Sequence, residues 1–349
     1  MNFIKNLSLN ELNQYFELLE EKKFRTKQLL EAIYKNRVNS FDEISNFPKE
    51  LRQKLSEDFS LTSLEFVDYV QSQDNSKKIL YKVKNSNDDF IETIFLPNSK
   101  NLYTAPINTL CISTMLGCPI NCAFCATAKL GFNRNLTISE ILDQILLTEQ
   151  IFNQKINNVV LMGMGEPLLN YNNVLEALKI LTTYNIINRK NITLSTVGIP
   201  QKIIQLADSD IKIKLALSLH SPFDEVRKQL IPNAYKLNEI FKALDYYYKK
   251  TKLAITFEYI LLKTINNREE DIQKLVKLSR RFPSKINIIP FNDISFTGAS
   301  QNFSGASIDE INLFAEKLNK EKVLAIVRNS QGQDIAAACG QLAYNLQKK

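Results

Sequence analysis

The sequence contains few of the residues from which many enzymes build their active sites. It has a single histidine, His220, among 349 residues. A mechanism that uses several imidazoles is therefore excluded, and so is a zinc site with two histidine ligands. Acid–base chemistry must instead use carboxylates, thiols or lysines.

Long apolar segments are also missing. No run of about 18 apolar residues occurs, which argues against a membrane-spanning helix. The beginning, MNFIKNLSLNELNQYF, lacks the apolar stretch of a secretory signal peptide. The cysteine count is low and odd, at five. We therefore expect a reducing, cytoplasmic environment without structural disulfides, although a transient catalytic disulfide remains possible.

The charge balance permits a polyanionic partner without requiring one. Net charge is +7, from 44 Lys and Arg against 37 Asp and Glu. Residues 22–54 are basic, but residues 1–60 as a whole carry ten residues of each sign. A basic surface there would depend on which face the lysines and arginines occupy, and a solvated helical surface is an equally good interpretation.

The first 60 residues are typical of short helices. Ser8 and Glu11 have the spacing of a capping box before an apolar stripe, and Ser40 and Glu43 repeat that spacing. We predict a compact helical domain over residues 1–60.

Residues 61–107 have a different character. Up to residue 97 the chain has β-rich runs divided by Asn, Asp and Ser, as in an antiparallel meander. NSKNLYTAPIN, residues 98–108, is typical of a loop or linker. We predict a β-rich connecting segment here.

From residue 108 onward, six apolar β runs alternate with helical patterns. The runs are NTLCIST, INNVVLMGM, NITLSTV, IKIKLALSLH, LAITFEYILL and KINIIPF. This alternation predicts a parallel α/β sheet or open barrel over residues 108–349. Chemistry in such folds gathers at the carboxyl ends of the strands.

Three cysteines lie within a span of eight positions, in the loop that follows the first of these strand runs. Cys118, Cys122 and Cys125 form a Cys-x3-Cys-x2-Cys pattern. Three thiolates on a four-iron cluster would leave one iron open for a substrate or cofactor. The alternatives are a zinc site completed by Cys111, Cys339 or His220, and an accidental group of buried thiols.

Polar residues follow other strands of the same sheet. GMGEP has glycines that let the backbone approach a ligand, and Glu166 could accept a hydrogen bond from an ammonium group. Ser195, His220 and Asn292 also follow strand runs, so we expect one shared site. Taken alone, GMGEP is equally typical of a tight turn without a ligand. Taken alone, His220 is equally typical of a histidine at a strand end whose hydrogen bonds are all made within the protein.

The cysteine pattern resembles that of the radical S-adenosylmethionine (SAM) superfamily. GCPINCAFCATAKLGFNRNL, MGMGEPLLNY, LSTVGI, LALSLHSP, RNSQGQDIAAACGQL and FRTKQLLEAIYKNRV together resemble the RlmN family of RNA methyltransferases over nearly the whole chain. The resemblance implies a partial (β/α)6 radical SAM barrel with a small N-terminal helical domain that binds RNA. It also implies a [4Fe–4S] cluster and SAM as cofactors.

The resemblance assigns residues to both cofactors. Cys118, Cys122 and Cys125 would ligate the cluster. The SAM contacts would be Gly165, Glu166, Ser195, Ser218, Leu219, His220 and Asn292.

The two remaining cysteines receive catalytic roles from the same resemblance. Cys339 would take a methyl group from one SAM, and a radical derived from a second SAM would activate this methyl group for addition to adenine C2. Cys111 would then attack the Cys339 sulfur, forming a transient disulfide and releasing the product. Glu92 would accept the C2 proton, or Cys111 would do so instead.

The resemblance implies 23S rRNA and tRNA as partners, together with an external electron donor of the flavodoxin or ferredoxin type. We expect a monomer. GFNRNL and Pro167 favour C2 over the C8 chemistry of the related chloramphenicol–florfenicol resistance methyltransferases. A non-catalytic, zinc-stabilised RNA-binding protein and a radical enzyme acting on proteins or small molecules are the alternatives from other classes.

Overall fold

The structure is a computed structural model that describes residues 2–86, 88–97, 107–297, 303–328 and 331–342. Most of the linker expected at residues 98–108 lies outside these ranges. No helix of the described ranges is long and apolar enough to cross a membrane.

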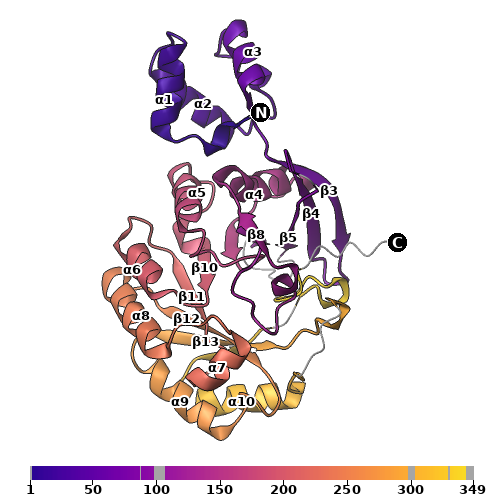
Figure 1. The fold of residues 1–349 in the computed structure, drawn as a ribbon, viewed down its shortest axis with the longest axis vertical. Helices are drawn as coiled ribbons and strands as arrows, with labels where there is room; N and C mark the ends of the chain where they lie inside the picture. The colour runs from indigo at the N-terminus through magenta and orange to yellow at the C-terminus, as the bar shows by residue number, and fades with distance from the viewer. Residues whose placement is uncertain (1, 87, 98–106, 298–302, 329–330, 343–349) are drawn as a thin grey trace.

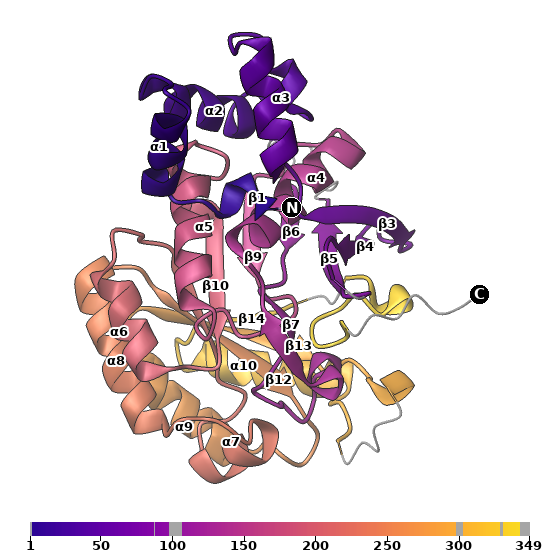
Figure 2. The same ribbon diagram turned by 45° about the horizontal axis from the view of Figure 1, so that its top comes forward.

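The N-terminal residues form a small helical lobe at one end of the molecule (Figure 1, Figure 2). Its elements are β1 (Asn2–Phe3), α1 (Leu9–Leu18), α2 (Phe24–Tyr34), α3 (Lys49–Asp58) and β2 (Phe59–Ser60), with β1 and β2 paired in parallel. The capping box predicted before α1 is present, because the Ser8 side chain accepts from Glu11 N and the Glu11 side chain accepts from Ser8 N.

The second capping box expected in this lobe was wrong. Ser40 makes no side-chain cap, and only a short 3-10 turn follows it, at Phe41–Glu43. The Glu43 carboxylate instead accepts from Asn39 N at 3.0 Å. The helix α3 begins later, after Pro48, whose fixed φ suits a helix start.

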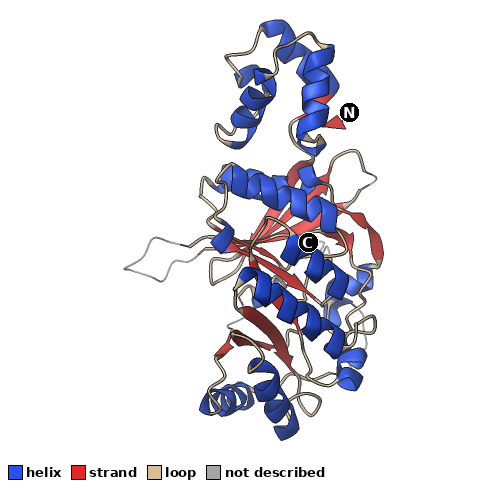
Figure 3. Ribbon diagram, turned by 90° about the vertical axis from the view of Figure 1, so that its left-hand side faces the viewer, coloured by secondary structure: helices blue, strands red, loops and turns tan. Residues whose placement is uncertain are grey.

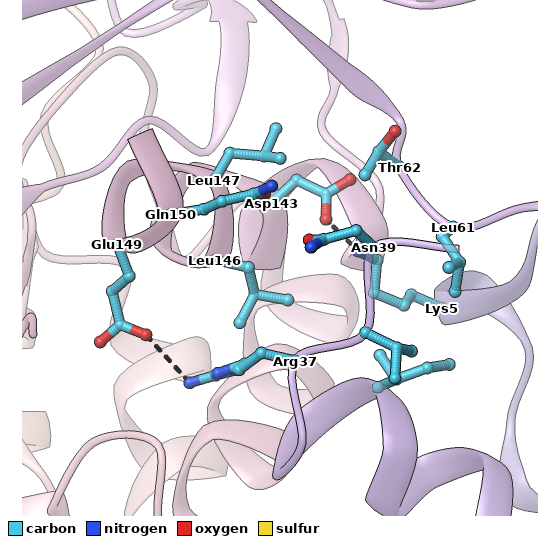
Figure 4. Close-up of a pocket in the computed structure, with 12 residues that line it drawn as sticks. Lys5, Arg37, Asn39, Leu61, Thr62, Asp143, Leu146, Leu147, Glu149 and Gln150 are labelled. Atoms are coloured by element: carbon cyan, nitrogen blue, oxygen red, sulfur yellow. Dashed lines mark hydrogen bonds and ion pairs between the residues drawn. The ribbon is translucent and has the colours of Figure 1, made fainter. Parts of the chain in front are cut away.

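The lobe is joined to the rest of the chain mainly through α4 (Ile138–Phe152). Lys5 pairs with Asp143, and both side chains are buried. Arg37 pairs with Glu149 at 3.0 Å. Figure 4 shows these two pairs on either side of a cavity of about 410 Å³ between the lobe and α4.

One ten-stranded sheet runs through the remainder of the molecule, in the order β14-β13-β12-β11-β10-β9-β6-β5-β4-β3. Its parallel strands are β6 (Thr109–Cys111), β9 (Asn158–Leu161), β10 (Ile192–Thr196), β11 (Lys214–Ser218), β12 (Ile255–Leu261), β13 (Ser284–Pro290) and β14 (Ala325–Val327). The six predicted strands are the first six of these. The partial (β/α)6 barrel is therefore confirmed.

Helices between the strands cover one face of the sheet (Figure 3). They are α4, α5 (Tyr171–Thr183), α6 (Pro200–Asp208), α7 (Asp224–Leu230), α8 (Leu237–Thr251), α9 (Glu269–Ser279) and α10 (Ile308–Lys320). The Thr137–Glu140 pair caps α4 by a reciprocal capping box. A continuous apolar core joins these helices, except α7, to the sheet and to the N-terminal lobe, whereas Leu230 of α7 packs in a separate cluster with Ile120 and Val197.

The predicted β-rich segment is an antiparallel meander, and it extends the same sheet. It comprises β3 (Leu64–Gln71), β4 (Lys77–Val83) and β5 (Phe90–Leu96), and β5 pairs with β6. The meander is thus continuous with the parallel strands. Its register places Ile94 beside Cys111, at the edge of the candidate site.

Candidate active site

A cavity of about 160 Å³ lies at the carboxyl ends of the parallel strands. It is lined by nine of the thirteen site residues expected from the sequence. These are Cys118, Cys122, Cys125, Gly165, Glu166, Ser195, Ser218, His220 and Cys339. The remaining four, Cys111, Glu92, Leu219 and Asn292, do not line it.

The three clustered cysteines lie on a loop closed at its base by the hairpin of β7 (Met115–Gly117) and β8 (Phe132–Asn135). Cys118 N donates to Gly131 O at 2.8 Å. Gly117 has φ +73°, and a Cβ there would meet Gly131 O at 1.9 Å. Glycine is therefore required where the two ends of the loop cross.

Burial strongly disfavours the charged form of these thiols. It raises the pKa of Cys118 to about 12, and it also raises the pKa of Cys122 and Cys125. The other thiols of the group raise the pKa of Cys122 further. Thiolates here need a compensating positive charge, which bound iron would provide.

The donor set consists of sulfur, which fits an iron–sulfur cluster or another thiophilic metal. No group of three or more His, Cys, Asp or Glu in the described part of the chain converges on one point as the ligands of a single metal ion do. A four-iron cluster has no such requirement, because each cysteine ligates a different iron. Cys111 lies away from the cavity, among Ile94, Met164 and Ala337.

The loop after β9 supplies Glu166. Its carboxylate accepts from Leu168 N at 3.0 Å and from Val197 N at 2.8 Å. Burial raises its pKa to about 7, against the opposing effect of these hydrogen bonds. Near neutral pH this carboxylate can therefore accept the ammonium group of a ligand in its charged form.

The glycines of GMGEP serve a purpose that the sequence did not indicate. A Cβ on Gly163 would meet the Ile112 carbonyl at 2.7 Å, and one on Gly165 would meet the Met115 side chain at 2.6 Å. Gly165 also has φ +103°. Both glycines thus allow this loop to pack against residues 112–115, and both also line the cavity.

Polar side chains form a row across neighbouring strands on the floor of the cavity. Ser195 Oγ lies 3.4 Å from Ser218 Oγ. Ser218 is in register with Glu258 of β12, and Glu258 is in register with Asn287 of β13. Glu258 also lines the cavity.

Sequence reasoning missed both Glu258 and Asn287. The available signal was a carboxylate in the middle of an apolar strand, ITFEYIL, all of which is buried. Charged residues are rarely buried without a partner or a role.

His220 has a left-handed backbone, with φ +55°. Its Nδ1 accepts from Ile260 N at 3.1 Å, which places the ring proton on Nε2. Burial lowers the pKa of His220 to about 3, so the ring is neutral. A neutral imidazole with its proton on Nε2 presents a hydrogen-bond donor.

Leu219 is fully buried, and the structure does not bring it to the cavity wall. Its N–H donates to Glu258 O, and its carbonyl accepts from Arg227 Nε. Arg227, a second residue that the sequence did not indicate, is only 1% exposed. Its guanidinium also donates to the carbonyls of Val197, Ser218 and Tyr235. Arg227 thereby ties together the turns that carry the cavity residues.

The C-terminal segment brings Cys339 to the cavity. Ala126 N, directly after the cysteine loop, donates to Gly340 O at 2.7 Å. Asn292 Nδ2 donates to Cys339 O at 3.1 Å. In this structure Asn292 therefore holds the Cys339 segment, whereas the sequence predicts a SAM contact. The Cys339 side chain is accessible, but the surrounding atoms of the cavity raise its pKa to about 11.

Cys111 and Glu92 lie on the other side of this segment. Cys111 packs with Ala337 and Leu342, and its pKa is raised by burial and by the neighbouring Cys339. Glu92 is buried and lies 3.5 Å from Lys78, whose Nζ also donates to Ala336 O. The structure thus brings both spare thiols and Glu92 close to the same short segment.

Comparisons with known proteins agree with this geometry. The profile of the Radical SAM superfamily matches residues 112–277. The profile of the ribosomal RNA large subunit methyltransferase N-terminal domain matches residues 2–61.

Full-length relatives were also found. The chain is 39% identical to a "Probable dual-specificity RNA methyltransferase RlmN" of Clostridium novyi, over 99% of this chain and 98% of the relative. It is 40% identical to a protein of that name from Thermus thermophilus, over 96% and 94%. A crystal structure of a radical SAM methyltransferase from Sphaerobacter thermophilus matches with a TM-score of 0.89 and 31% identity, over 98% and 99% of the two chains.

Proposed function

This chain belongs to the RlmN family of radical SAM RNA methyltransferases, and we propose that it methylates C2 of adenine in 23S rRNA and in tRNA with Cys339 as the methyl carrier. Its cofactors are a [4Fe–4S] cluster and SAM. The words "dual-specificity" in the relatives' names support two classes of RNA substrate.

The placement of the two spare thiols is the observation that carries the proposal. Cys339 opens into the cavity that contains the three clustered cysteines, whereas Cys111 packs beneath the same segment. A methyl carrier needs access to the methyl donor, and a release nucleophile needs access to the carrier. An ordinary methyltransferase without a carrier thiol would need neither arrangement.

The residues that line the cavity would hold the cofactors. Cys118, Cys122 and Cys125 would ligate the cluster, and Glu166 would accept the SAM ammonium group. Ser195 and Ser218 present hydroxyls on the floor of the cavity. When bound, these cofactors supply a methyl group and a 5′-deoxyadenosyl radical.

The remaining steps use groups of this chain. Cys339 carries the methyl group and becomes linked to adenine C2 through it. Glu92 accepts the C2 proton at its carboxylate, beside Lys78. The Cys111 sulfur attacks the Cys339 sulfur and forms a disulfide. The bond from Cys339 to the methylene carbon breaks, its electron pair stays on the adenine side, and this carbon takes up a proton to become the methyl group.

The N-terminal lobe would hold the RNA backbone. Lys22, Lys23 and Lys27 are exposed at or near the start of α2. Lysines bind phosphate oxygens without reading sequence. The adenine must leave its stack to reach the cavity, which favours RNA loops or distorted helices as substrates.

Methylation assays on variants test the carrier role. The variant Cys339→Ala is expected to assemble the cluster normally, as judged by iron and sulfide content, and to give no methylated RNA. Residual turnover would remove Cys339 from the mechanism. Mass spectrometry of digested wild-type product would separate 2-methyladenosine from the C8 isomer, and the C8 isomer would refute the proposed position.

The variant Cys111→Ala tests the release step. It is expected to remain covalently attached to RNA, because no thiol can attack Cys339. A denaturing gel would show the protein–RNA species. Normal release of methylated RNA by this variant would contradict the role of Cys111.

The proposal includes the partners that such a reaction requires. A flavodoxin or ferredoxin type of donor would supply the electrons, and the enzyme would act as a monomer in the cytoplasm, where its RNA substrates occur. Reconstitution with either purified donor and with rRNA or tRNA fragments would test the electron source.

A further inference from the structure

A buried acid on the floor of the cavity has no role in the mechanism above. Glu258 lies in the middle of β12, in a strand whose residues are all buried, and it lines the same cavity as Cys339. Its register with Ser218 and Asn287 places it in the polar row that crosses β10 to β13. The row therefore continues with a carboxylate beyond the two serines.

The Glu258 carboxylate is held by a specific partner. Asn287 Nδ2 donates to Glu258 Oε1 at 2.8 Å, and Asn287 is itself 4% exposed. Asn287 Oδ1 has no hydrogen-bond partner among the described residues. This amide fixes one carboxylate oxygen and leaves Oε2 free of that bond.

Opposing effects act on the pKa of Glu258. Burial raises its pKa, and the hydrogen bond from Asn287 and the charges of Arg328 and Lys285 oppose this rise. The Glu258 charge in turn raises the pKa of Cys339, because the two groups interact electrostatically. A raised pKa makes a carboxylate a stronger base toward a thiol proton.

The first half of the reaction needs a base at this position. With a pKa of about 11, Cys339 is almost entirely a thiol at neutral pH, and a thiol is a poor nucleophile. Glu166 is engaged by two backbone N–H groups, and the proton of His220 on Nε2 makes that ring a donor. Glu92 is paired with Lys78 on the Cys111 side of the segment. Glu166 and Glu258 are the carboxylates among the described residues that line the cavity, so Glu258 is left to take the proton.

We propose that Glu258 is the general base that accepts the thiol proton of Cys339 while the methyl group is transferred to its sulfur. The inference rests on the proposed carrier role of Cys339. The electron pair of the S–H bond forms the new S–CH3 bond, and the proton moves to the Glu258 carboxylate. The sulfonium carbon–sulfur bond of SAM breaks and leaves its electron pair on a neutral thioether. Two carboxylates then accept protons in different steps. Glu258 accepts the proton of the Cys339 thiol, and Glu92 accepts the proton of adenine C2.

Single-turnover methylation of Cys339 tests this assignment. The reconstituted holoenzyme would be mixed with saturating SAM, quenched at intervals, and digested, and the added methyl group on the Cys339 peptide measured by mass spectrometry. In Glu258→Gln the rate is expected to fall by about 100-fold, the lower range for general-base catalysis. Glu258→Asp is expected to recover part of it, and the exposed-site control Glu310→Gln should keep the wild-type rate.

A second measurement separates a base from a simple contact with SAM. Equilibrium dialysis should give the same SAM affinity for Glu258→Gln as for the wild type. Alkylation of Cys339 by iodoacetamide should not become slower, because removing the nearby negative charge lowers the thiol pKa. Weaker SAM binding with a normal rate at saturation would overturn the proposal, as would an unchanged rate of methylation.

The wild-type pH profile decides the question even if the variants fail to assemble iron. With Glu258 as base, the rate should reach a plateau once this carboxylate is ionised. Without a base, the rate should rise about tenfold per pH unit up to about pH 9, following the thiolate. That continuous rise would refute the role of Glu258. An absence of any methyl on wild-type Cys339 would instead refute the carrier role itself.

Discussion

Replacing Glu166 by glutamine is expected to change how the stability of the iron-free protein depends on pH. Burial raises the pKa of this carboxyl from 4.5 to about 7 in the folded chain. A raised pKa means that the folded state binds the proton more tightly than the unfolded state. The corresponding stability is fully present below pH 4.5 and is lost as the pH rises through about 7.

The expected magnitude follows from the two pKa values. One pKa unit corresponds to about 1.4 kcal/mol. Between about pH 5 and pH 8 the two titrations predict a loss of about 2.5 kcal/mol of unfolding free energy from this group alone. Glutamine cannot titrate, so Glu166→Gln should lose about 2.5 kcal/mol less than the wild type over the same interval.

Urea unfolding of both proteins at the two ends of that pH interval measures this difference. The substitution also places an amide donor near Leu168 N or Val197 N, but that cost is independent of pH and cancels between the two conditions. Glu310→Gln is the control of opposite sign, since its backbone hydrogen bond to Ser307 lowers the pKa of Glu310. An equal loss of stability in the wild type and in Glu166→Gln would refute burial as the cause.

The same group should govern SAM binding. In the wild type, SAM affinity should increase as the pH rises through about 7, because the ammonium group binds the ionised carboxylate. Glu166→Gln should bind weakly at every pH. The smaller loss of unfolding free energy at high pH and the weaker SAM binding of Glu166→Gln would then have the same cause. Both follow from removing a carboxylate that the wild type keeps buried to bind its ligand.

Three further predictions concern the scaffold of the site. Arg227→Ala should lower the unfolding free energy by at least about 3 kcal/mol, because carbonyls lose this donor in two buried and two half-buried hydrogen bonds, whereas the exposed Lys228→Ala should change it little. The NMR signals of the single imidazole, His220, should stay constant from about pH 5 to pH 8 in iron-free protein, because burial lowers the pKa of the ring to about 3. A titration midpoint near 6.5 would show that the ring is not buried. Asp143→Asn should cost about 3–5 kcal/mol by leaving Lys5 buried without its partner, and unchanged urea unfolding would disprove the importance of this pair.

The sequence predicted the parts of the site that depend on local spacing. The cysteine triad, GMGEP and LSLH each follow an apolar strand run, and parallel strands bring their carboxyl ends together. Nine predicted residues accordingly line one cavity. The capping box at Ser8 and Glu11 was correct for the same reason, because it depends on residues three apart.

Features that depend on the course of the surrounding chain were missed. Ser40 and Glu43 have the correct spacing for a capping box, yet the chain turns only briefly there and Glu43 bonds Asn39 instead. Asn292 holds the Cys339 segment, an interaction across 47 residues of sequence.

What the sequence alone determined is the chemistry that the chain can perform: one histidine, three closely spaced thiols, and two spare cysteines in a parallel α/β fold. Only the tertiary structure decided how those groups act. It placed Cys339 and Glu258 on one cavity, it packed Cys111 against Ala337 and Leu342 of the Cys339 segment, and it buried the carboxyl of Glu166 so that its pKa approaches 7. Spacing along the chain is local information, whereas burial and the proximity of charges are set by strands and loops far apart in the sequence.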